Sequence, residues 1–179
     1  MRWIASLLPL LAALLPLPLV AASFCVSNSA ELQAAIAAAA SNADSNDTIR
    51  LRPGVYPSPP DGFGRQVFAP GDNVSISGGW LPLIGACDLP GYDASASVID
   101  GAEQRAGLVF LRSGVGSGQT NLSWLTIRGG RQMSSSLYFG NGGGLAVHGS
   151  GPVTIENLIF RNNRATVNGG ALYIGGTQR

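Results

Sequence analysis

The stretch FRNNRATVNGGALYI, residues 160–174, joins two short apolar segments through paired asparagines, a polar turn and two glycines. Its first part belongs to VTIENLIFRNNR (153–164), which aligns without a gap with TNLSWLTIRGGR (120–131) at an offset of 33 residues. Its second part, GGALYI (169–174), aligns with GGGLAV (142–147) at an offset of 27 residues. One unit therefore occurs twice, with a longer loop in its first copy.

The alignment sets apolar positions against apolar positions, because Leu122 falls opposite Ile155 and Ile127 opposite Phe160. A repeat of about 27 residues built from short strands and turns is typical of a β-solenoid. Neighbouring coils would lie about 4.8 Å apart, the ordinary strand spacing. We therefore predict an all-β solenoid. An antiparallel sandwich is the alternative, but it does not predict an in-register repeat.

The N-terminal 22 residues have the pattern of a secretory signal peptide. Arg2 gives a basic start, an apolar run follows from Ile4 to Val20, and Ala22 ends a site of small residues. An uncleaved membrane helix is the alternative, but the run is short and contains three prolines. A lipoprotein is disfavoured because Phe24, before Cys25, is large. We expect an exported protein, secreted or at the outer membrane, with no membrane span in its mature part.

The mature chain divides into an N-terminal cap, residues 23–47, and coils over residues 48–179. In the cap, Asn28 and Glu31 have the spacing of a capping box. The alanine-rich run that follows predicts an amphipathic helix. Its predicted buried face is formed by Leu32, Ala35, Ile36 and Ala39.

Both cysteines, Cys25 and Cys87, lie in the predicted exported part. An oxidising compartment favours a disulfide between them. Two free buried thiols are the alternative.

Two short stretches resemble known families. Phe160-Arg161-Asn162-Asn163 and Gly169-Gly170-Ala171-Leu172 match the FxxN and GGA[IL] elements of polymorphic outer-membrane protein repeats, although Gly130 replaces the asparagine in the first copy. Residues 30–56 are similar to the N-terminal caps of pectate-lyase-like proteins. These resemblances imply a right-handed parallel β-helix with a capping helix. They imply function only weakly, because one fold hosts many activities.

Residues that carry chemistry are sparse. After Gly101 the only carboxylates are Glu103 and Glu156, and the chain has no lysine and a single histidine, His148. A two-carboxylate hydrolase needs both groups within about 5–10 Å, and a calcium site needs clustered carboxylates. We therefore expect no catalytic residue, metal or cofactor. The mature chain has 10 arginines against 10 acids, so a nucleic-acid partner is not expected.

The candidate ligand-binding residues are four aligned arginines and a tryptophan. Arg128 aligns with Arg161, and Arg131 aligns with Arg164, so stacked repeats would set two arginine pairs on the outer face. Arginine suits bidentate recognition of carboxylate or sulfate. Trp124 could stack on a sugar ring. Ordinary solvated turn residues are the alternative interpretation.

These patterns lead to a functional hypothesis: an exported bacterial scaffold, an adhesin-like passenger segment without its own catalytic activity. Its expected partner is an acidic polysaccharide or a cell-surface glycan. The alternative is the N-terminal fragment of a polysaccharide lyase or glycoside hydrolase. Because Arg179 follows a repeat strand directly, we expect a truncated solenoid whose open C-terminal end can self-associate.

Overall fold

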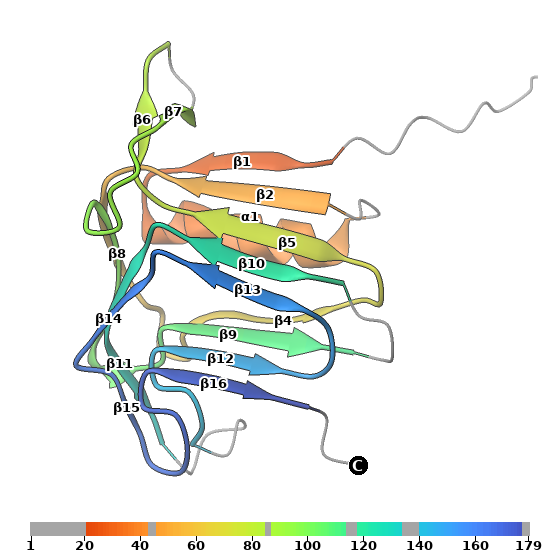
Figure 1. The fold of residues 1–179 in the computed structure, drawn as a ribbon, viewed down its shortest axis with the longest axis vertical. Helices are drawn as coiled ribbons and strands as arrows, with labels where there is room; N and C mark the ends of the chain where they lie inside the picture. Colours follow the sequence, from red (N-terminus) through yellow and green to blue (C-terminus); the bar gives the residue numbers. More distant parts are fainter. Residues whose placement is uncertain (1–20, 43–45, 85–86, 114–117, 134–139, 177–179) are drawn as a thin grey trace, which may run out of the picture.

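The computed structural model describes residues 21–42, 46–84, 87–113, 118–133 and 140–176 (Figure 1). The apolar run of the predicted signal peptide lies outside these residues. The elements are β1 Ser23–Val26, α1 Ser29–Ser41, β2 Asn46–Leu51, β3 Gly54–Pro57, β4 Phe63–Phe68, β5 Asn73–Ser77, β6 Trp80–Pro82, β7 Cys87–Pro90, β8 Ser97–Arg105, β9 Leu108–Arg112, β10 Thr120–Ser123, β11 Thr126–Gln132, β12 Leu145–His148, β13 Val153–Glu156, β14 Ile159–Arg161, β15 Arg164–Ala165 and β16 Leu172–Gly175.

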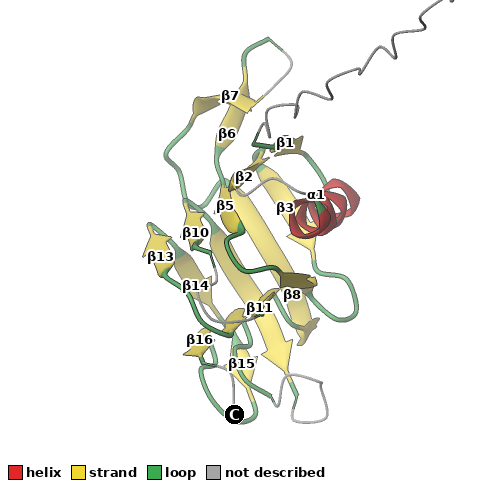
Figure 2. Ribbon diagram, turned by 90° about the vertical axis from the view of Figure 1, so that its right-hand side faces the viewer, coloured by secondary structure: helices red, strands yellow, loops and turns green. Residues whose placement is uncertain are grey.

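Three sheets of parallel strands make up most of the molecule (Figures 1 and 2). The first sheet has the order β1-β2-β5-β10-β13. The second has the order β14-β11-β8-β3, with β15 also paired to β11, and the third has the order β16-β12-β9-β4. The fourth sheet is an antiparallel pair, β6-β7, which projects from the end of the molecule near β1.

The pairing register matches the repeat alignment. Leu122 pairs with Ile155 in the first sheet, and Ile127 pairs with Phe160 in the second. The 27-residue offset is also present in the third sheet, where β12 pairs with β16 and Leu145 lies beside Leu172. The predicted in-register pairing of the two copies is therefore confirmed.

The predicted fold class is wrong. An all-β, right-handed parallel β-helix would join its coils in a single solenoid. The described strands instead belong to four separate sheets, and the same part of the chain also contains one helix, α1. No closed solenoid is found in this part of the chain, and the arrangement is a multi-sheet fold of α/β type. Left-handed residues such as Trp124 and Asn157 lie between strands of different sheets. Hydrogen-bond ladders therefore end at these turns, which an alignment of apolar positions does not reveal.

The core lies between the three parallel sheets and is built from stacked apolar side chains. Ile49, Ile76 and Leu122 occupy neighbouring strands of the first sheet and are at most 1% exposed. In the third sheet the Phe110 ring lies 5.8 Å from that of Phe68. Strands β13, β14 and β16, at the far side, have half-buried residues in place of fully buried ones, among them Phe160.

Helix α1 forms as its sequence predicts. The Asn28 side chain accepts a hydrogen bond from the Glu31 backbone N–H at 3.0 Å, and Glu31 in turn accepts from Ser27. These contacts satisfy N–H groups that have no partner within a helix. The hydrogen bond from the Ser27 backbone, followed by that from its hydroxyl, lowers the pKa of Glu31. The predicted apolar face is buried and packs toward β2 and β4.

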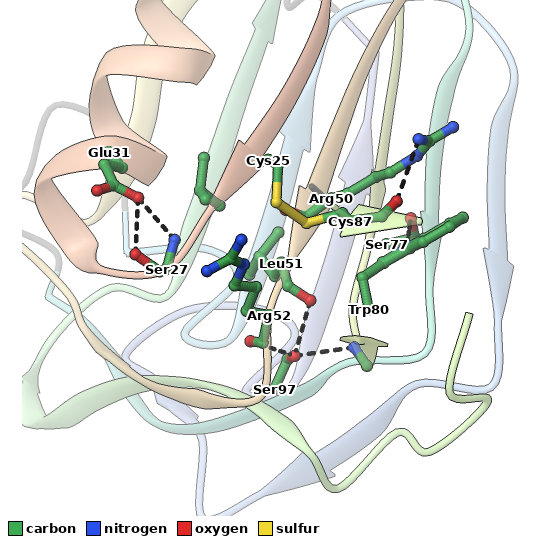
Figure 3. Close-up of a disulfide and its surroundings, with 12 residues drawn as sticks. Cys25, Ser27, Glu31, Arg50, Leu51, Arg52, Ser77, Trp80, Cys87 and Ser97 are labelled. Carbon is green, nitrogen blue, oxygen red and sulfur yellow. Dashed lines mark hydrogen bonds between the residues drawn. A yellow bond between two sulfur atoms is a disulfide. The ribbon is translucent and has the colours of Figure 1, made fainter. Parts of the chain in front are cut away.

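The predicted disulfide between Cys25 and Cys87 is confirmed (Figure 3). It joins β1 to the β6-β7 pair across 62 residues of sequence. Beside it the Arg50 guanidinium lies 4.4 Å from the Trp80 ring and donates to the Cys87 carbonyl at 3.3 Å. Besides the chain connection from β5, the β6-β7 pair is thus attached to the first sheet by the disulfide, by Arg50 and by a 2.7 Å hydrogen bond that the Trp80 Nε1–H donates to the Ser77 hydroxyl.

Asn163 connects two neighbouring strands of the second sheet. Its side-chain amide donates to the Ile127 carbonyl at 2.8 Å and its oxygen accepts from the Gly130 N–H at 2.8 Å. Both partners are backbone groups of β11 in the gap between its ladder with β14 and its ladder with β15. The asparagine therefore replaces ladder hydrogen bonds that the irregular strand cannot make.

We expect Asn163→Ala to lower the free energy of unfolding by about 2 kcal/mol, because it leaves a donor and an acceptor unpaired in a half-buried position. Urea unfolding followed by circular dichroism would measure the change. Thr166→Ala, at an exposed position of the same turn, is the matched control and should stay within about 0.5 kcal/mol. Equal stabilities of the two variants would contradict this role of Asn163.

Candidate functional site

The candidate site is on the outer side of the second sheet, where β8 departs from its neighbour. In the register of β8 with β11, Asp100 lies opposite Arg128, but the next register pair is Arg105 opposite Gly130. Residues 101–104 of β8 therefore lie opposite a single residue of β11, and we call them the β8 loop. Ala102 and Glu103 in this loop have φ values of 51° and 59°. Left-handed backbone is costly for residues with a Cβ and tends to occur at functional sites.

Asp100 anchors the start of the β8 loop. Its carboxylate accepts a hydrogen bond from the Ala102 N–H at 2.8 Å and from the Arg128 guanidinium at 2.9 and 2.7 Å. Partial burial acts to raise the pKa of Asp100, but the Ala102 N–H and the Arg128 cation outweigh it and lower this pKa. Asp100 therefore stays ionised near neutral pH, and Arg128 is largely neutralised.

The four predicted arginines lie together in two pairs. Arg128 is in register with Arg161, and Arg131 with Arg164, on adjacent parallel strands. All four are exposed. Among the residues that the structure describes, Arg131, Arg161 and Arg164 form no ion pair. The in-register stacking of both predicted pairs is confirmed, and we call these four exposed arginines together the arginine face.

Two adjoining pockets accompany the arginine face and share Glu103 and Asn162 as lining residues. The first, which we call the Glu103 pocket, has a volume of about 330 Å³ and is lined by Glu103, Gly130, Arg131, Asn162 and Arg164. The second, of about 410 Å³, is lined by Asp100, Ala102, Glu103, Arg128, Gly129 and Asn162. Neither lining set includes Arg161.

Trp124 lies apart from the pocket lining. It is half-buried with a φ of 56°, between β10 and β11, and its ring lies 5.2 Å from that of Tyr92 in an edge-to-face contact. Tyr92 is 64% exposed. This aromatic pair has the apolar surface that a sugar ring needs for stacking, but the structure does not join it to the two pockets.

Asp100 is not suited to the acid role in a glycosidase. A two-carboxylate mechanism needs one carboxyl group that stays protonated near neutral pH. The pKa of Asp100 is lowered, and its carboxylate accepts hydrogen bonds from Arg128. The arrangement is suited to binding anions and hydroxyl groups.

His148 does not add chemistry to this site. It ends β12 in the third sheet, its ring lies 5.1 Å from the Tyr173 ring, and burial lowers its pKa. Among the described residues, no group of three His, Cys, Asp or Glu side chains is placed to hold a metal ion. The same residues include no helix that is long and apolar enough to span a membrane.

The sequence alone missed Asp100, Asn162 and Glu103 as residues that line the two pockets. Asp100 and Glu103 lie outside the aligned repeats, because β8 has no counterpart in the alignment of 120–131 with 153–164. The Asp100-Gly101 pair is a turn signal that could have indicated an irregularity here. It could not have indicated which arginines face it.

No protein-family model, curated protein or solved structure matches this chain. The resemblances to polymorphic outer-membrane protein repeats and to a pectate-lyase-like cap are therefore wrong as family assignments. The residues concerned have local explanations. Asn163 bonds to the neighbouring strand, and Gly169 has a φ of 62° that suits glycine. Any fold with stacked short strands has such needs, so short motifs of this kind arise without kinship.

Proposed function

We propose that this chain is an exported bacterial scaffold that binds an acidic polysaccharide or cell-surface glycan through its arginine face. It acts as an adhesin-like segment, secreted or at the cell surface, and has no catalytic activity of its own. The observation that carries the proposal is the in-register pairing of Arg131 with Arg164 and of Arg128 with Arg161, with one acidic partner among the described residues.

Like charges on directly adjacent strands are mildly destabilising. Asp100 offsets this cost for Arg128, but the pair of Arg131 and Arg164 has no acidic partner among the described residues and gives up a little stability. An anionic polymer would remove the repulsion and accept forked hydrogen bonds from the guanidinium groups. Because the mature chain as a whole has a net charge near zero, the attraction would be local to these arginines and would weaken with salt.

Two further features support the proposal. The Cys25–Cys87 disulfide suits an oxidising compartment, which is where an exported protein functions. The edge-to-face pair of Tyr92 and Trp124 offers a stacking surface at the start of β11, the strand that carries two of the arginines. Self-association through the side formed by β13, β14 and β16 stays a prediction.

The test changes Arg128, Arg131, Arg161 and Arg164 together to glutamine. This change removes the positive charges but keeps a polar side chain at each of these exposed positions. We expect retention on immobilised polygalacturonate at low salt to fall by roughly tenfold or more, since each exposed ion pair contributes about 0.2–1 kcal/mol. Circular dichroism must first show that the variant is folded.

The matched control changes the same four residues to lysine. The lysine variant keeps the positive charges but loses the bidentate hydrogen-bond geometry of the guanidinium groups. It should therefore bind polygalacturonate better than the glutamine variant and less well than the parent. Equal retention of parent and glutamine variant would contradict the proposal. The same incubations should release no reducing ends or unsaturated uronate, and turnover by the parent would overturn the non-catalytic part.

A further inference from the structure

The Glu103 pocket combines opposite charges that are not paired with each other. Arg131 and Arg164 supply two cations on adjacent strands, and Glu103 supplies a carboxylate on the β8 loop. Within the described residues, neither arginine forms an ion pair with Glu103. Beside this pocket, Asp100 and Arg128 form an ion pair in which the Arg128 guanidinium nitrogen lies 2.7 Å from the Asp100 carboxylate oxygen. The open pocket therefore leaves a volume of about 330 Å³ between unlike groups.

The loop and turn that carry the acceptors have unusual backbone. Glu103, Ala102 and Asn162 all have φ between 51° and 59°. Asn162 adopts this conformation more readily than most residues, but glutamate and alanine do so at a cost. The loop is supported by the two ends of the register shift, where Asp100 binds Arg128 and Arg105 donates to the Ser58 carbonyl at 2.8 Å. The β8 loop that carries Glu103 is thus held in place by contacts at both of its ends.

The chemistry of the lining groups is that of a ligand with both an anion and hydroxyl groups. The two guanidinium groups offer planar forks of donors, which match a carboxylate. Asn162 can donate and accept. Glu103 when ionised can only accept, so it needs a donor such as a sugar hydroxyl. A densely sulfated sugar has few free hydroxyl groups to donate to Glu103, and its several negative charges would be repelled by this carboxylate more strongly than the single charge of a uronate.

We infer that the Glu103 pocket binds a single uronate residue of the polysaccharide, and that Glu103 determines this specificity. Arg131 and Arg164 donate hydrogen bonds to the sugar carboxylate. Glu103 accepts hydrogen bonds from the sugar hydroxyl groups, and Asn162 accepts from them or donates to them. Glu103 thereby selects a hydroxylated carboxylate against densely sulfated polymers. This inference rests on the proposed function, since it names the ligand class of the same face.

The experiment measures retention of the intact, disulfide-bonded protein on immobilised polygalacturonate, dextran sulfate and neutral dextran at one salt concentration. Glu103→Ala should lower retention on polygalacturonate by about three- to tenfold, the range of a single lost hydrogen bond. The same change should raise retention on dextran sulfate, because it removes a repulsive charge. Gln104→Ala, an exposed neighbour in the β8 loop, is the control and should change neither.

Glu103→Gln separates the hydrogen bond from the charge. Its amide oxygen still accepts, so retention on polygalacturonate should fall less than in Glu103→Ala, while retention on dextran sulfate should rise equally. An increase on both anionic polymers in Glu103→Ala would show simple repulsion and overturn the specificity. In that outcome the quadruple change of the arginines to glutamine would still lower retention by roughly tenfold or more, and the proposed function would stand. Failure of the parent to bind either anionic polymer would overturn both.

Discussion

Replacing Cys25 and Cys87 together by serine should lower the free energy of unfolding by about 4 kcal/mol, the loop-closure value for a bridge of this length. The bond spans 62 residues and joins β1, at the edge of the first sheet, to the projecting β6-β7 pair. Without it, the unfolded chain regains the conformations that the closed loop excludes. In the folded state the hairpin would retain the Arg50 contacts with Trp80 and the Cys87 carbonyl.

Urea unfolding with and without a reductant provides the measurement. The parent should lose stability when the disulfide is reduced, while the double serine variant should be insensitive to the reductant. The single variants Cys25→Ser and Cys87→Ser should each resemble the double variant, because either one breaks the same bond. A loss below about 1 kcal/mol would contradict the loop-closure argument.

Arg112→Met should lower the free energy of unfolding by about 3 kcal/mol. Arg112 is only 4% exposed, and its guanidinium donates to the Asp72 and Gln119 carbonyls and to the Thr120 hydroxyl. It also lies 4.9 Å from the Phe68 ring. Methionine fills similar volume but leaves two carbonyls without their donor, where each unsatisfied buried group costs about 1–3 kcal/mol.

The control is Arg161→Met, an exposed arginine on which we expect a change within about 0.5 kcal/mol. Burial lowers the pKa of Arg112, although the Asp72 carboxylate opposes it, so its charge is held at a desolvation cost. If that cost equals the value of the hydrogen bonds, Arg112→Met would be neutral. Chemical denaturation of both variants decides between these outcomes, and a neutral Arg112→Met would contradict the prediction.

Local and pairwise features could be predicted from the sequence. Helix α1 forms because of its N-terminal capping residues and its alanine content, so the spacing of Asn28 and Glu31 predicts where it begins. The register of Leu122 with Ile155 follows from apolar spacing, because a slip of one residue would expose the whole buried face. The disulfide followed from the presence of only two cysteines, both in the part of the chain that is predicted to be exported.

The site itself was predicted only in part. The alignment placed the four arginines together, because residues at equal positions of paired strands share a face. It did not indicate that Arg128 is neutralised by Asp100, 28 residues earlier, or that Glu103 faces Arg131 and Arg164. These contacts depend on β8, whose loop has no copy in the repeat.

The sequence by itself therefore determined the helix, the strand register, the pairing of the arginines and the disulfide. Each of these depends on neighbouring residues, on periodic burial or on a unique pair of reactive groups. Only the tertiary structure decided that the strands divide into four separate sheets and that residues of the β8 loop line two pockets beside the arginines. Both outcomes depend on where the backbone turns left-handed, at Glu103, Trp124 and Asn157. None of these residues is a glycine, and such conformations are stabilised by surrounding contacts that a linear pattern does not contain.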